Sequence, residues 1–260
     1  MTTADVEALL AARLGEVRPA SVARELSSLR ALCRILLERG ELAVDPTAGL
    51  RVQIGAQRQL LLSLDQVRLL LAEASRPPRV RRSPELQRAL GLRNRAALEL
   101  LYALGVRASE ACDLRLLDLD LAQRSLGVQR VKRGPAGVLP LPEAVVSHLE
   151  RYLAQARPAL LRRRDEAGGA LLVNERGRRL TPNHLLRLVR GIASRVEVDA
   201  YTHAFRRAVA THLVANGAAL PAVQSLLGHK SLDTTQRYVA VSPDELRAAV
   251  ETLEPRAPSA

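Results

Sequence analysis

Aromatic side chains are scarce in this chain, and their scarcity limits how its interior can be built. The 260 residues include one Phe, four Tyr and no Trp, so aromatic residues make up 2% of the sequence. Hydrophobic residues still account for 47%, an ordinary share for a globular protein. Leu, Val and Ala must therefore form the core, and the length is sufficient for one large domain or two unequal ones.

Aliphatic residues recur every three or four positions over most of the chain, which is the spacing of one helix face. The segment SVARELSSLRALCRILLERG ends at Gly40, a favourable helix stop, and the aperiodic residues 44–59 are interpreted as a linker. A second helical region begins at residue 62 and is interrupted by a basic, proline-broken loop over residues 75–84. The predicted divisions are a helical region over 1–54, a linker over 55–60, a larger domain over 61–254 and a tail over 255–260.

Short strands are indicated only after about residue 117. SLGVQRV alternates, RGPAG supplies turn residues and VLPL follows, which predicts a β-hairpin over residues 125–141. The run ALLVN, residues 170–174, is interpreted as one further buried strand. Thr181 and Pro182 then begin another helix, and Ser242 opens the capping box of the last one. The predicted fold class is mainly α with a small antiparallel β-sheet or hairpin (α+β).

Positive charge is carried almost entirely by arginine. Lys and Arg number 39 against 27 Asp and Glu, which gives a net charge of +12 and a pI near 11.0. This balance indicates a polyanionic partner, although a coding bias toward Arg and Ala explains it about equally well. Only Lys132 and Lys230 are lysines, so the sequence raises the question of whether either position requires an ammonium group.

The cysteines and the termini point to an intracellular protein. Cys33 and Cys112 lie far apart in apolar helical patterns without metal-ligand spacing, which predicts buried free thiols in a reducing compartment. The first residues, MTTADVEALLAARLG, lack a signal-peptide pattern, and no apolar run approaches ~18 residues. We expect a cytoplasmic protein.

Two segments place polar residues at helix starts. In YALGVRASEACDL, Arg107 lies where one helix ends and another begins, so its planar guanidinium could bind a phosphate or carboxylate. Taken alone, Arg107 is more readily interpreted as a structural partner of Glu110. In THAFRRAVATHLVANG, His203 and Arg206 are three residues apart and share one helix face, a spacing that is common in helices.

Two further segments are equally inconclusive by themselves. In LLGHKSLDTTQRYV, His229 and Tyr238 would lie on opposite faces of one straight helix, and a break after Gly228 is what could let them converge. A core tyrosine is the simpler interpretation of Tyr238. Lys132 lies on the predicted hairpin, where a solvated charge is the simpler interpretation.

The four segments together, in the order Arg, Lys, His-x-x-Arg, His and Tyr, resemble the signature boxes of one family. That family is the tyrosine recombinases, also called phage integrases, and the closest resemblance is to the Xer-type site-specific recombinases. It covers about residues 20–250. It implies a tyrosine-recombinase catalytic fold preceded by a helical, SAM-like core-binding region. The implied enzyme cleaves and rejoins DNA strands through a 3′-phosphotyrosyl intermediate without a metal or nucleotide cofactor.

The resemblance also assigns roles to residues. Tyr238 is the nucleophile, and Lys132 protonates the departing 5′-oxygen, which an arginine with a pKa above ~12 cannot do. Arg107 and Arg206 hold the non-bridging oxygens. His203 accepts or returns the tyrosine proton, and the sixth member, His229, donates a hydrogen bond to the phosphate. Further contacts to DNA are expected from Lys230, Arg207 and Arg133.

The sequence departs from the family pattern at three places. The N-terminal helical region has roughly half the family's usual length, so either the chain is a reduced version or its start lies further upstream. Arg207 replaces a frequent histidine, and Pro135 and Gly137 alter the usual basic turn after Lys132. The shortened clamp therefore puts independent DNA affinity in question.

The resemblance implies a nucleoid-associated enzyme acting on a double-stranded recombination site. Relatives act as tetramers in which the C-terminal helix docks on a neighbouring subunit, which predicts a homo- or hetero-tetramer and a role such as chromosome partition. Two alternatives remain open from the sequence. One is type IB topoisomerase-like cleavage without strand exchange, and the other is a DNA-binding protein whose catalysis is impaired by the short clamp.

Overall fold

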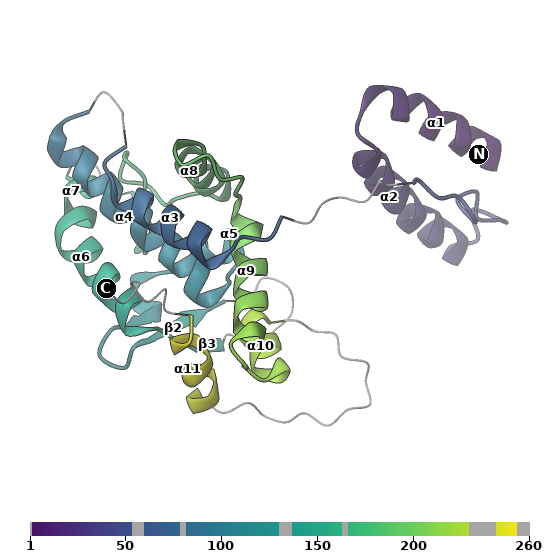
Figure 1. The fold of residues 1–260 in the computed structure, drawn as a ribbon. Helices are drawn as coiled ribbons and strands as arrows, with labels where there is room; N and C mark the ends of the chain where they lie inside the picture. Colours follow the sequence, from purple (N-terminus) through teal and green to yellow (C-terminus); the bar gives the residue numbers. More distant parts are fainter. Residues whose placement is uncertain are drawn as a thin grey trace. The chain divides into compact units, whose positions relative to one another are not determined.

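The computed structural model describes residues 2–53, 60–78, 82–129, 137–162, 166–228 and 243–253. The chain divides into two compact units, Met1–Gln59 and Leu60–Ala260 (Figure 1). Among the residues that the structure describes, none of the helices combines the length and apolar character needed to span a bilayer.

The first unit is a pair of helices, α1 (Thr3–Glu16) and α2 (Pro19–Glu38). Thr2 and Asp5 form a capping box at the start of α1, and the buried residues are few. These core residues are Val6, Leu10, Val22 and Leu26. The interpretation of residues 44–59 as a linker is wrong for its first part, because Leu50 and Val52 pack against this core. An irregular segment can still be anchored by alternate apolar side chains.

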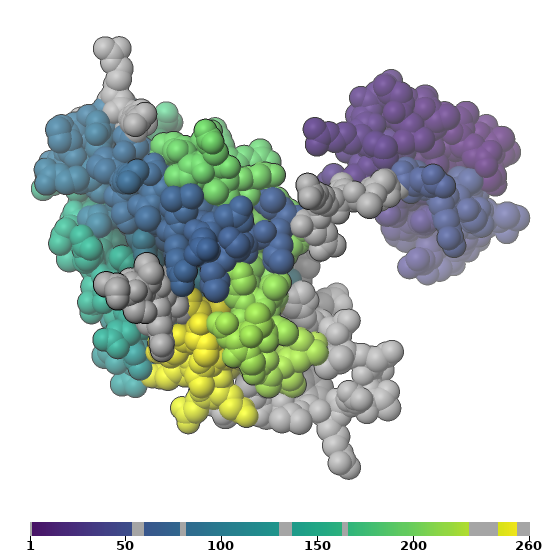
Figure 2. All heavy atoms as spheres, in the orientation of Figure 1, coloured from purple at the N-terminus to yellow at the C-terminus, as the bar shows by residue number. Residues whose placement is uncertain are grey.

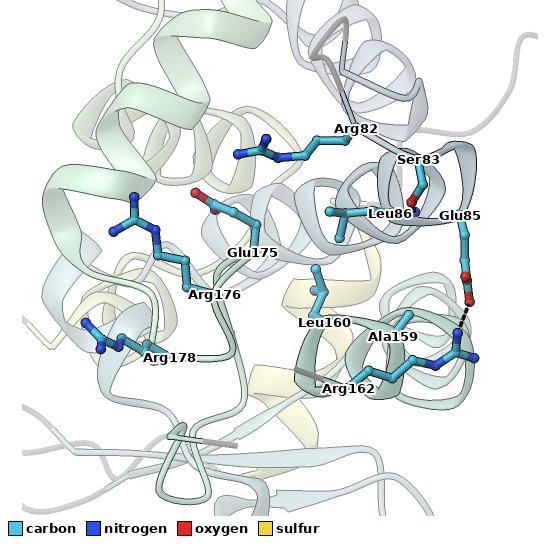
Figure 3. A pocket seen from close by; sticks show the side chains of 10 residues that line it. All are labelled: Arg82, Ser83, Glu85, Leu86, Ala159, Leu160, Arg162, Glu175, Arg176 and Arg178. Carbon is cyan, nitrogen blue, oxygen red and sulfur yellow. Dashed lines mark hydrogen bonds and ion pairs between the residues drawn. The ribbon is translucent and has the colours of Figure 1, made fainter. Parts of the chain in front are cut away.

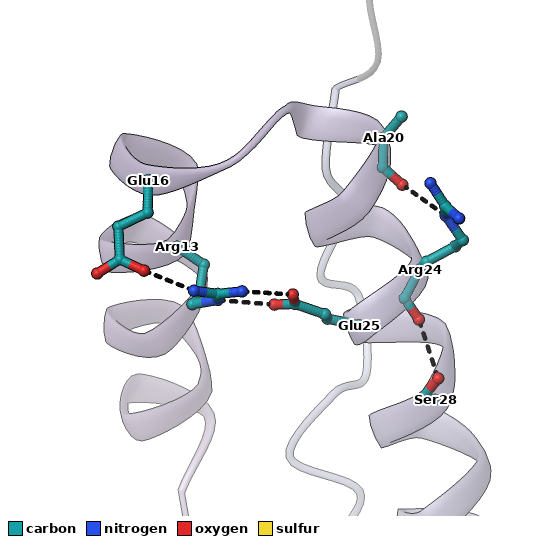
Figure 4. A network of polar contacts seen from close by, with 6 residues as sticks. All are labelled: Arg13, Glu16, Ala20, Arg24, Glu25 and Ser28. Atoms are coloured by element: carbon teal, nitrogen blue, oxygen red, sulfur yellow. Dashed lines mark hydrogen bonds and ion pairs between the residues drawn. The ribbon is translucent and has the colours of Figure 1, made fainter.

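Polar contacts tie the two helices of this unit together at the surface. The guanidinium of Arg13 on α1 donates to the carboxylate of Glu25 on α2, with Nε–Oε2 and Nη2–Oε1 distances of 3.0 and 2.8 Å (Figure 4). Its remaining Nη1 donates to Glu16 at 2.5 Å. Both carboxylates are exposed, so the network lies at the edge of a small apolar core.

The second unit is built around α4 (Pro84–Leu104), whose last turns are buried on every side. Its residues from Ala96 to Leu104 are all buried, and none of them is larger than tyrosine. Helices that pack on α4 include α3 (Leu64–Ser75), α5 (Ala108–Asp113), α6 (Glu143–Arg151), a π-helical turn (Tyr152–Ala156) and α7 (Arg157–Leu161). The expected aliphatic core is confirmed, with Tyr102, Tyr152 and Phe205 as its only fully buried aromatic side chains within the described ranges.

A small antiparallel sheet follows α5 and a 3-10 turn (Leu116–Asp118). Its strands are β1 (Leu119–Asp120), β2 (Ser125–Val128) and β3 (Gly137–Pro140), in the order β1-β2-β3. The predicted hairpin is confirmed, since Leu126 faces Leu139 in the register of β2 and β3. The strand predicted over ALLVN is wrong: Leu171, Leu172 and Val173 are buried, but residues 170–174 make only isolated bridges. These residues are apolar because they are buried, and no neighbouring strand in the described part of the chain pairs with them in a continuous ladder.

In the described part of this unit four further helices follow, namely α8 (Pro182–Arg195), α9 (Thr202–Ala215), α10 (Leu220–Leu227) and α11 (Pro243–Glu251). The predicted cap of α8 is confirmed, because the Thr181 hydroxyl accepts from the backbone N–H of His184. Gly228 ends α10 in the left-handed conformation, as predicted. Figure 2 shows α11, in yellow, against the green atoms of α10, and α11 also packs on β3. Cys33 and Cys112 are buried and free, as expected.

Candidate active site

The site begins where the buried helix α4 stops. Gly105 ends α4 with a φ of 57°, a left-handed conformation that glycine adopts without strain. A Cβ atom there would lie 2.5 Å from Cδ2 of Leu227, so the glycine also allows the end of α10 to approach. The chain then turns, and Arg107 becomes the residue that precedes α5.

Arg107 is held by a buried carboxylate. Glu110 is 3% exposed, and its Oε1 accepts from Nη1 of Arg107 at 2.6 Å while its Oε2 accepts from the Arg107 backbone N–H at 2.8 Å. The structural partnership expected from the sequence is therefore confirmed. The side chain of Arg107 remains about one-third exposed. An arginine that is fixed on one side and accessible on the other is preorganised to bind an anion.

Arg206 connects three elements at the same place. It lies in the first half of α9 and is 7% exposed. Its Nη1 donates to the carbonyl oxygen of Gly105 at 2.6 Å, and its Nη2 donates to the carbonyl oxygen of Leu227. One guanidinium thus joins α9 to the ends of α4 and α10. Because both carbonyls lie at helix ends, where intrahelical donors are missing, the arginine also satisfies groups that would otherwise lack partners.

His203 lies one turn before Arg206 on α9, and its side chain is exposed. Partial burial of the ring lowers the pKa of His203 below its usual value. The positive charges of three arginines, Arg206, Arg207 and Arg107, lower this pKa further. A lowered pKa favours the neutral form of the ring, which is the form that can accept a proton, and the charges that lower it include those of Arg107 and Arg206.

The structure thus brings together four of the nine predicted site residues: Arg107, His203, Arg206 and Arg207. The other five, Lys132, Arg133, His229, Lys230 and Tyr238, lie outside the described residues. Their flanks are described. Arg206 bonds Leu227, which is followed by Gly228 and then, in the sequence, by His229.

Two partners of the arginines could not be found by motif reasoning. The carbonyls of Gly105 and Leu227 belong to residues that are 101 and 21 positions away from Arg206. A backbone acceptor has no residue-type signature, so sequence spacing gives no signal for it. The one available signal is indirect. Gly105 and Gly228 end helices in the left-handed conformation, and the last carbonyl groups of a helix need donors from elsewhere.

Comparison with known proteins defines the class of this site. Residues 61–245 match the model of the phage integrase family. The chain belongs to this family. Among curated relatives, it is 36% identical over 245 residues to the tyrosine recombinase XerD of Listeria innocua serovar 6a, covering 92% of this chain and 77% of the relative. It is 38% identical over 239 residues to the tyrosine recombinase XerC of Mycobacterium tuberculosis (strain ATCC 25177 / H37Ra), covering 91% and 78%.

Solved structures agree on the fold. The Tn1549 transposon integrase, residues 82–397, in complex with circular intermediate DNA superposes with a TM-score of 0.71 at 17% identity, covering 95% of this chain and 84% of that one. XerA recombinase gives a TM-score of 0.55 at 24% identity, covering 99% and 85%. The predicted fold class and the resemblance to Xer-type enzymes are confirmed. The chain is a tyrosine-type site-specific recombinase, and these relatives favour neither the topoisomerase-like nor the non-catalytic alternative.

Proposed function

We propose that the cluster of Arg107, His203 and Arg206 binds the DNA phosphodiester that is cleaved. The observation that carries this proposal is the fixed placement of two arginines, one by a buried carboxylate and one by two backbone carbonyls, whose charges help to lower the pKa of His203. Charge grows on the non-bridging oxygens in the pentacoordinate transition state. Preorganised donors that meet this charge lower the barrier without reorganising during the reaction.

Tyr238 supplies the nucleophile in this proposal. Its phenolic oxygen forms a bond to phosphorus as the bond from phosphorus to the 5′-oxygen breaks, which leaves a 3′-phosphotyrosyl link. His203 accepts the phenolic proton, because a tyrosine with a pKa near ~10 is a weak nucleophile at neutral pH. Lys132 gives a proton to the leaving 5′-oxygen, and His229 donates a hydrogen bond to the phosphate. Reversal of these steps on a new strand rejoins the DNA.

The remaining parts of the chain are assigned to DNA binding and assembly. Residues 1–54 act as a shortened clamp, the linker 55–60 joins it to the catalytic domain 61–254, and residues 255–260 form a tail. Arg133, Lys230 and Arg207 bind the backbone of a double-stranded recombination site. The enzyme acts in the cytoplasm at the nucleoid.

Strand exchange requires several protomers, and α11 is suited to link them. In this chain α11 packs on its own β3 and α10 and buries Leu246 and Val250, and Leu253, just after its end, is buried too. The same apolar face can dock on the same surface of a neighbouring copy. We infer a homo- or hetero-tetramer with exchange of α11, and a structural neighbour, the lambda integrase, has been solved as a tetramer bound to a Holliday junction.

A suicide substrate tests the chemistry. A duplex nicked near the cleavage point loses its 5′-hydroxyl fragment after cleavage, so the covalent protein–DNA adduct accumulates. The intact chain should form this adduct on its recombination site, and the Tyr238→Phe variant should form none. DNA binding without adduct would support a non-catalytic protein. Relaxation of supercoiled plasmid without recombinant products would support a topoisomerase-like enzyme.

The proposed role of Lys132 as the general acid is tested separately. The Lys132→Arg variant should retain DNA binding and lose cleavage rate, because an arginine does not release its proton usefully. A substrate with a bridging 5′-sulfur has a leaving group that needs no proton, and it should restore the rate. If the sulfur substrate is cleaved as slowly as the oxygen one, Lys132 is a surface charge and the acid is another group.

A further inference from the structure

A buried hydrogen bond joins α9 to α4 in addition to the bond made by Arg206. Nδ1 of His212 on α9 lies 3.0 Å from the phenolic oxygen of Tyr102 on α4, although 110 residues separate them in the sequence. Tyr102 is 1% exposed and His212 is 8% exposed. The two rings meet edge to face, with their centroids 6.0 Å apart. Because water hardly reaches this pair, the two polar groups satisfy each other.

The direction of this hydrogen bond follows from the burial of both groups. Burial raises the pKa of Tyr102 to about 12, so the phenol keeps its proton and can donate it to a hydrogen bond. Burial lowers the pKa of His212, which favours the neutral ring with one acceptor nitrogen. The hydroxyl of Tyr102 therefore donates to Nδ1, and the proton of the neutral ring is on Nε2.

His212 also bonds the backbone just before α3. A hydrogen bond with the backbone of Leu62 acts against the effect of burial and raises the pKa of His212, as an acceptor such as a carbonyl oxygen does. Since Nδ1 already accepts from Tyr102, the donor to this carbonyl is Nε2. Leu62 is buried and directly precedes Ser63, the N-cap of α3. One imidazole thus connects α9 with α4 and with the start of α3.

His212 and Arg206 attach the same helix to α4 at two levels. Arg206 donates to the carbonyl oxygen of Gly105 at 2.6 Å, whereas His212 accepts from Tyr102, about one turn earlier on α4. The six-residue separation of Arg206 and His212 on α9 corresponds to roughly 9 Å along the axis and, at ~100° per residue, to different sides of the helix. A helix held by one bond can rotate about it. Two bonds at different levels and on different sides fix both its rotation and its axial position.

The position of α9 decides where two groups of the candidate active site lie. His203 and Arg206 are both on α9, whereas Arg107 precedes α5 and is held separately by Glu110. The distances between these groups therefore depend on how α9 is placed against the end of α4. A misplacement of ~1 Å in such an arrangement can lower the rate by about 10²-fold. A buried contact that fixes α9 can thus affect the reaction from inside the fold.

The other end of α4 is attached by an exposed ion pair, which provides a control. There Glu85 pairs with Arg162, the residue that follows α7, at 2.6 Å. Figure 3 shows this pair beside a pocket of about 860 Å³. Both side chains are more than half exposed, so solvent screens the pair. Its loss should leave α9 in place.

We propose that His212 is a positioning residue of the recombination reaction. Through Tyr102 it fixes α9 against the last turn of α4, and through Leu62 it fixes α9 against the start of α3. This placement holds His203 and Arg206 at the phosphate that is cleaved. The inference rests on the proposed function, because it takes that phosphate as their ligand. His212 itself does not contact the DNA.

Substitutions that each keep a different bond test this role. In His212→Asn, the side-chain Oδ1 stands near the position of Nδ1 and can accept from Tyr102. In His212→Gln, the side-chain Nε2 can donate to the carbonyl of Leu62, but Tyr102 loses its acceptor. His212→Phe keeps a ring and removes both bonds. Glu85→Gln is the control, because it removes a polar contact of α4 at its exposed end.

The suicide substrate separates positioning from folding. With DNA in excess, the final amount of adduct measures the fraction of molecules that is folded and active, and the rate constant measures how well those molecules react. His212→Phe should lower the rate constant by about 10- to 100-fold and change DNA affinity by less than about twofold. His212→Asn should recover most of the rate and His212→Gln less of it. Glu85→Gln should react like the intact chain.

Two outcomes of this experiment would overturn the proposal. The first is a His212→Phe variant that forms less adduct but with the rate constant of the intact chain, which would make His212 purely structural. The second is an equal rate constant for His212→Asn and His212→Phe, since the bond to Tyr102 would then not position α9.

Tyr102→Phe covers the case in which a change at His212 prevents folding. This variant lacks a single oxygen atom, so it should form nearly as much adduct as the intact chain but with a lower rate constant. Where the His212→Phe variant folds, combining the two substitutions should lower the rate no further than His212→Phe alone, because both remove the same bond. An unchanged rate constant for Tyr102→Phe, or additive losses in the double variant, would overturn the proposal.

A measurement without DNA keeps this proposal apart from the proposed function. The pKa of His203 is lowered by burial and by two arginines on its own helix, and also by Arg107, which lies outside α9. A displaced α9 should therefore raise the pKa of His203 toward its usual value, and NMR titration of its ring in the intact chain and in His212→Phe measures this.

The two proposals then fail in different ways. If the intact chain forms no adduct but the pKa of His203 rises in His212→Phe, the proposed function fails and the placement of α9 by His212 stands. If the intact chain forms the adduct and neither the rate constant nor this pKa changes in His212→Phe, the proposed function stands and the positioning role fails. No adduct and no change in the pKa would overturn both.

Discussion

Arginines tie helices together in both units, but the groups that they bond differ. In the first unit, Arg13 joins α1 to α2 through the exposed carboxylates of Glu16 and Glu25. In the second unit, Arg206 joins α9 to α4 and α10 through the carbonyls of Gly105 and Leu227, and it is buried. Solvent screens the ion pairs of Arg13. A hydrogen bond that Arg206 loses would not be replaced by one to water, because the site is buried.

The difference shows why the same residue type has different consequences. An exposed ion pair exchanges with water and contributes little to the free energy of unfolding. A buried guanidinium that satisfies helix-end carbonyls determines where three elements meet. The position of Arg206 is therefore part of the fold as well as of the proposed phosphate site, and substitutions there should affect both.

The largest effect is expected for Arg206→Ala. Two carbonyl oxygens lose their donor in a buried place, so the free energy of unfolding should fall by roughly 2–5 kcal/mol. Adduct formation should fall by at least about 10²- to 10³-fold, the usual cost of removing one transition-state donor. Denaturant unfolding and the suicide substrate measure the two quantities. Arg206→Lys is the control: it keeps the charge but cannot reach both carbonyls, so unchanged stability in this variant would contradict the bridging role.

The next effect is expected for Glu110→Gln. The amide retains a hydrogen bond to the backbone N–H of Arg107 but loses the charge that fixes the guanidinium at 2.6 Å. Adduct formation should fall by about 10- to 100-fold because the arginine is less well oriented. The free energy of unfolding should change by only about 1–2 kcal/mol. A loss of stability as large as that of Arg206→Ala, with unchanged cleavage by the folded fraction, would make Glu110 purely structural.

A smaller effect is expected in the pH dependence of cleavage. The pKa of His203 is lowered by partial burial and by nearby arginines, so the neutral, proton-accepting form persists to a lower pH than for an ordinary histidine. Adduct formation should therefore be lost only as the pH falls below the usual histidine range. Arg207→Gln removes one positive charge and should shift this acid limb to higher pH. A pH profile of single-turnover cleavage measures the shift, and an unmoved limb would assign it to another group.

The sequence was sufficient to predict those structural features that depend on neighbouring residues alone. Thr181 and Gly228 mark helix ends through their own side-chain and backbone preferences, and the structure confirms both. ALLVN was misinterpreted because an apolar run reports burial, whereas a strand also needs a partner that the sequence does not identify. Arg107, His203 and Arg206 were predicted from the order of the four segments along the chain. That order resembles a family pattern, and it carries information that the spacing within any single segment lacks.

The rest could not be predicted because it depends on distant residues. The acceptors of Arg206 are backbone atoms, and the buried Arg93 of α4 likewise donates to the carbonyl oxygen of Val173, which is 80 residues further along the chain. In a chain with 39 basic residues, no local pattern distinguishes these arginines from solvated ones. Burial and bonds to distant carbonyls distinguish them, and both are properties of the fold.

The smallest effect is expected for Arg13→Gln, and this variant completes the comparison between the units. Glu16 and Glu25 are exposed and can be hydrated once the guanidinium is gone, so the apolar contacts of Val6, Leu10 and Leu26 should still hold α1 on α2. The unfolding midpoint should be nearly that of the intact chain, and any small decrease should disappear at high salt, where the ion pairs are screened in both proteins. Cleavage of the suicide substrate should be unchanged. A decrease as large as that of Arg206→Ala would show that exposed carboxylates and buried carbonyls stabilise helix pairs equally in this chain, and the distinction between the two units would fail.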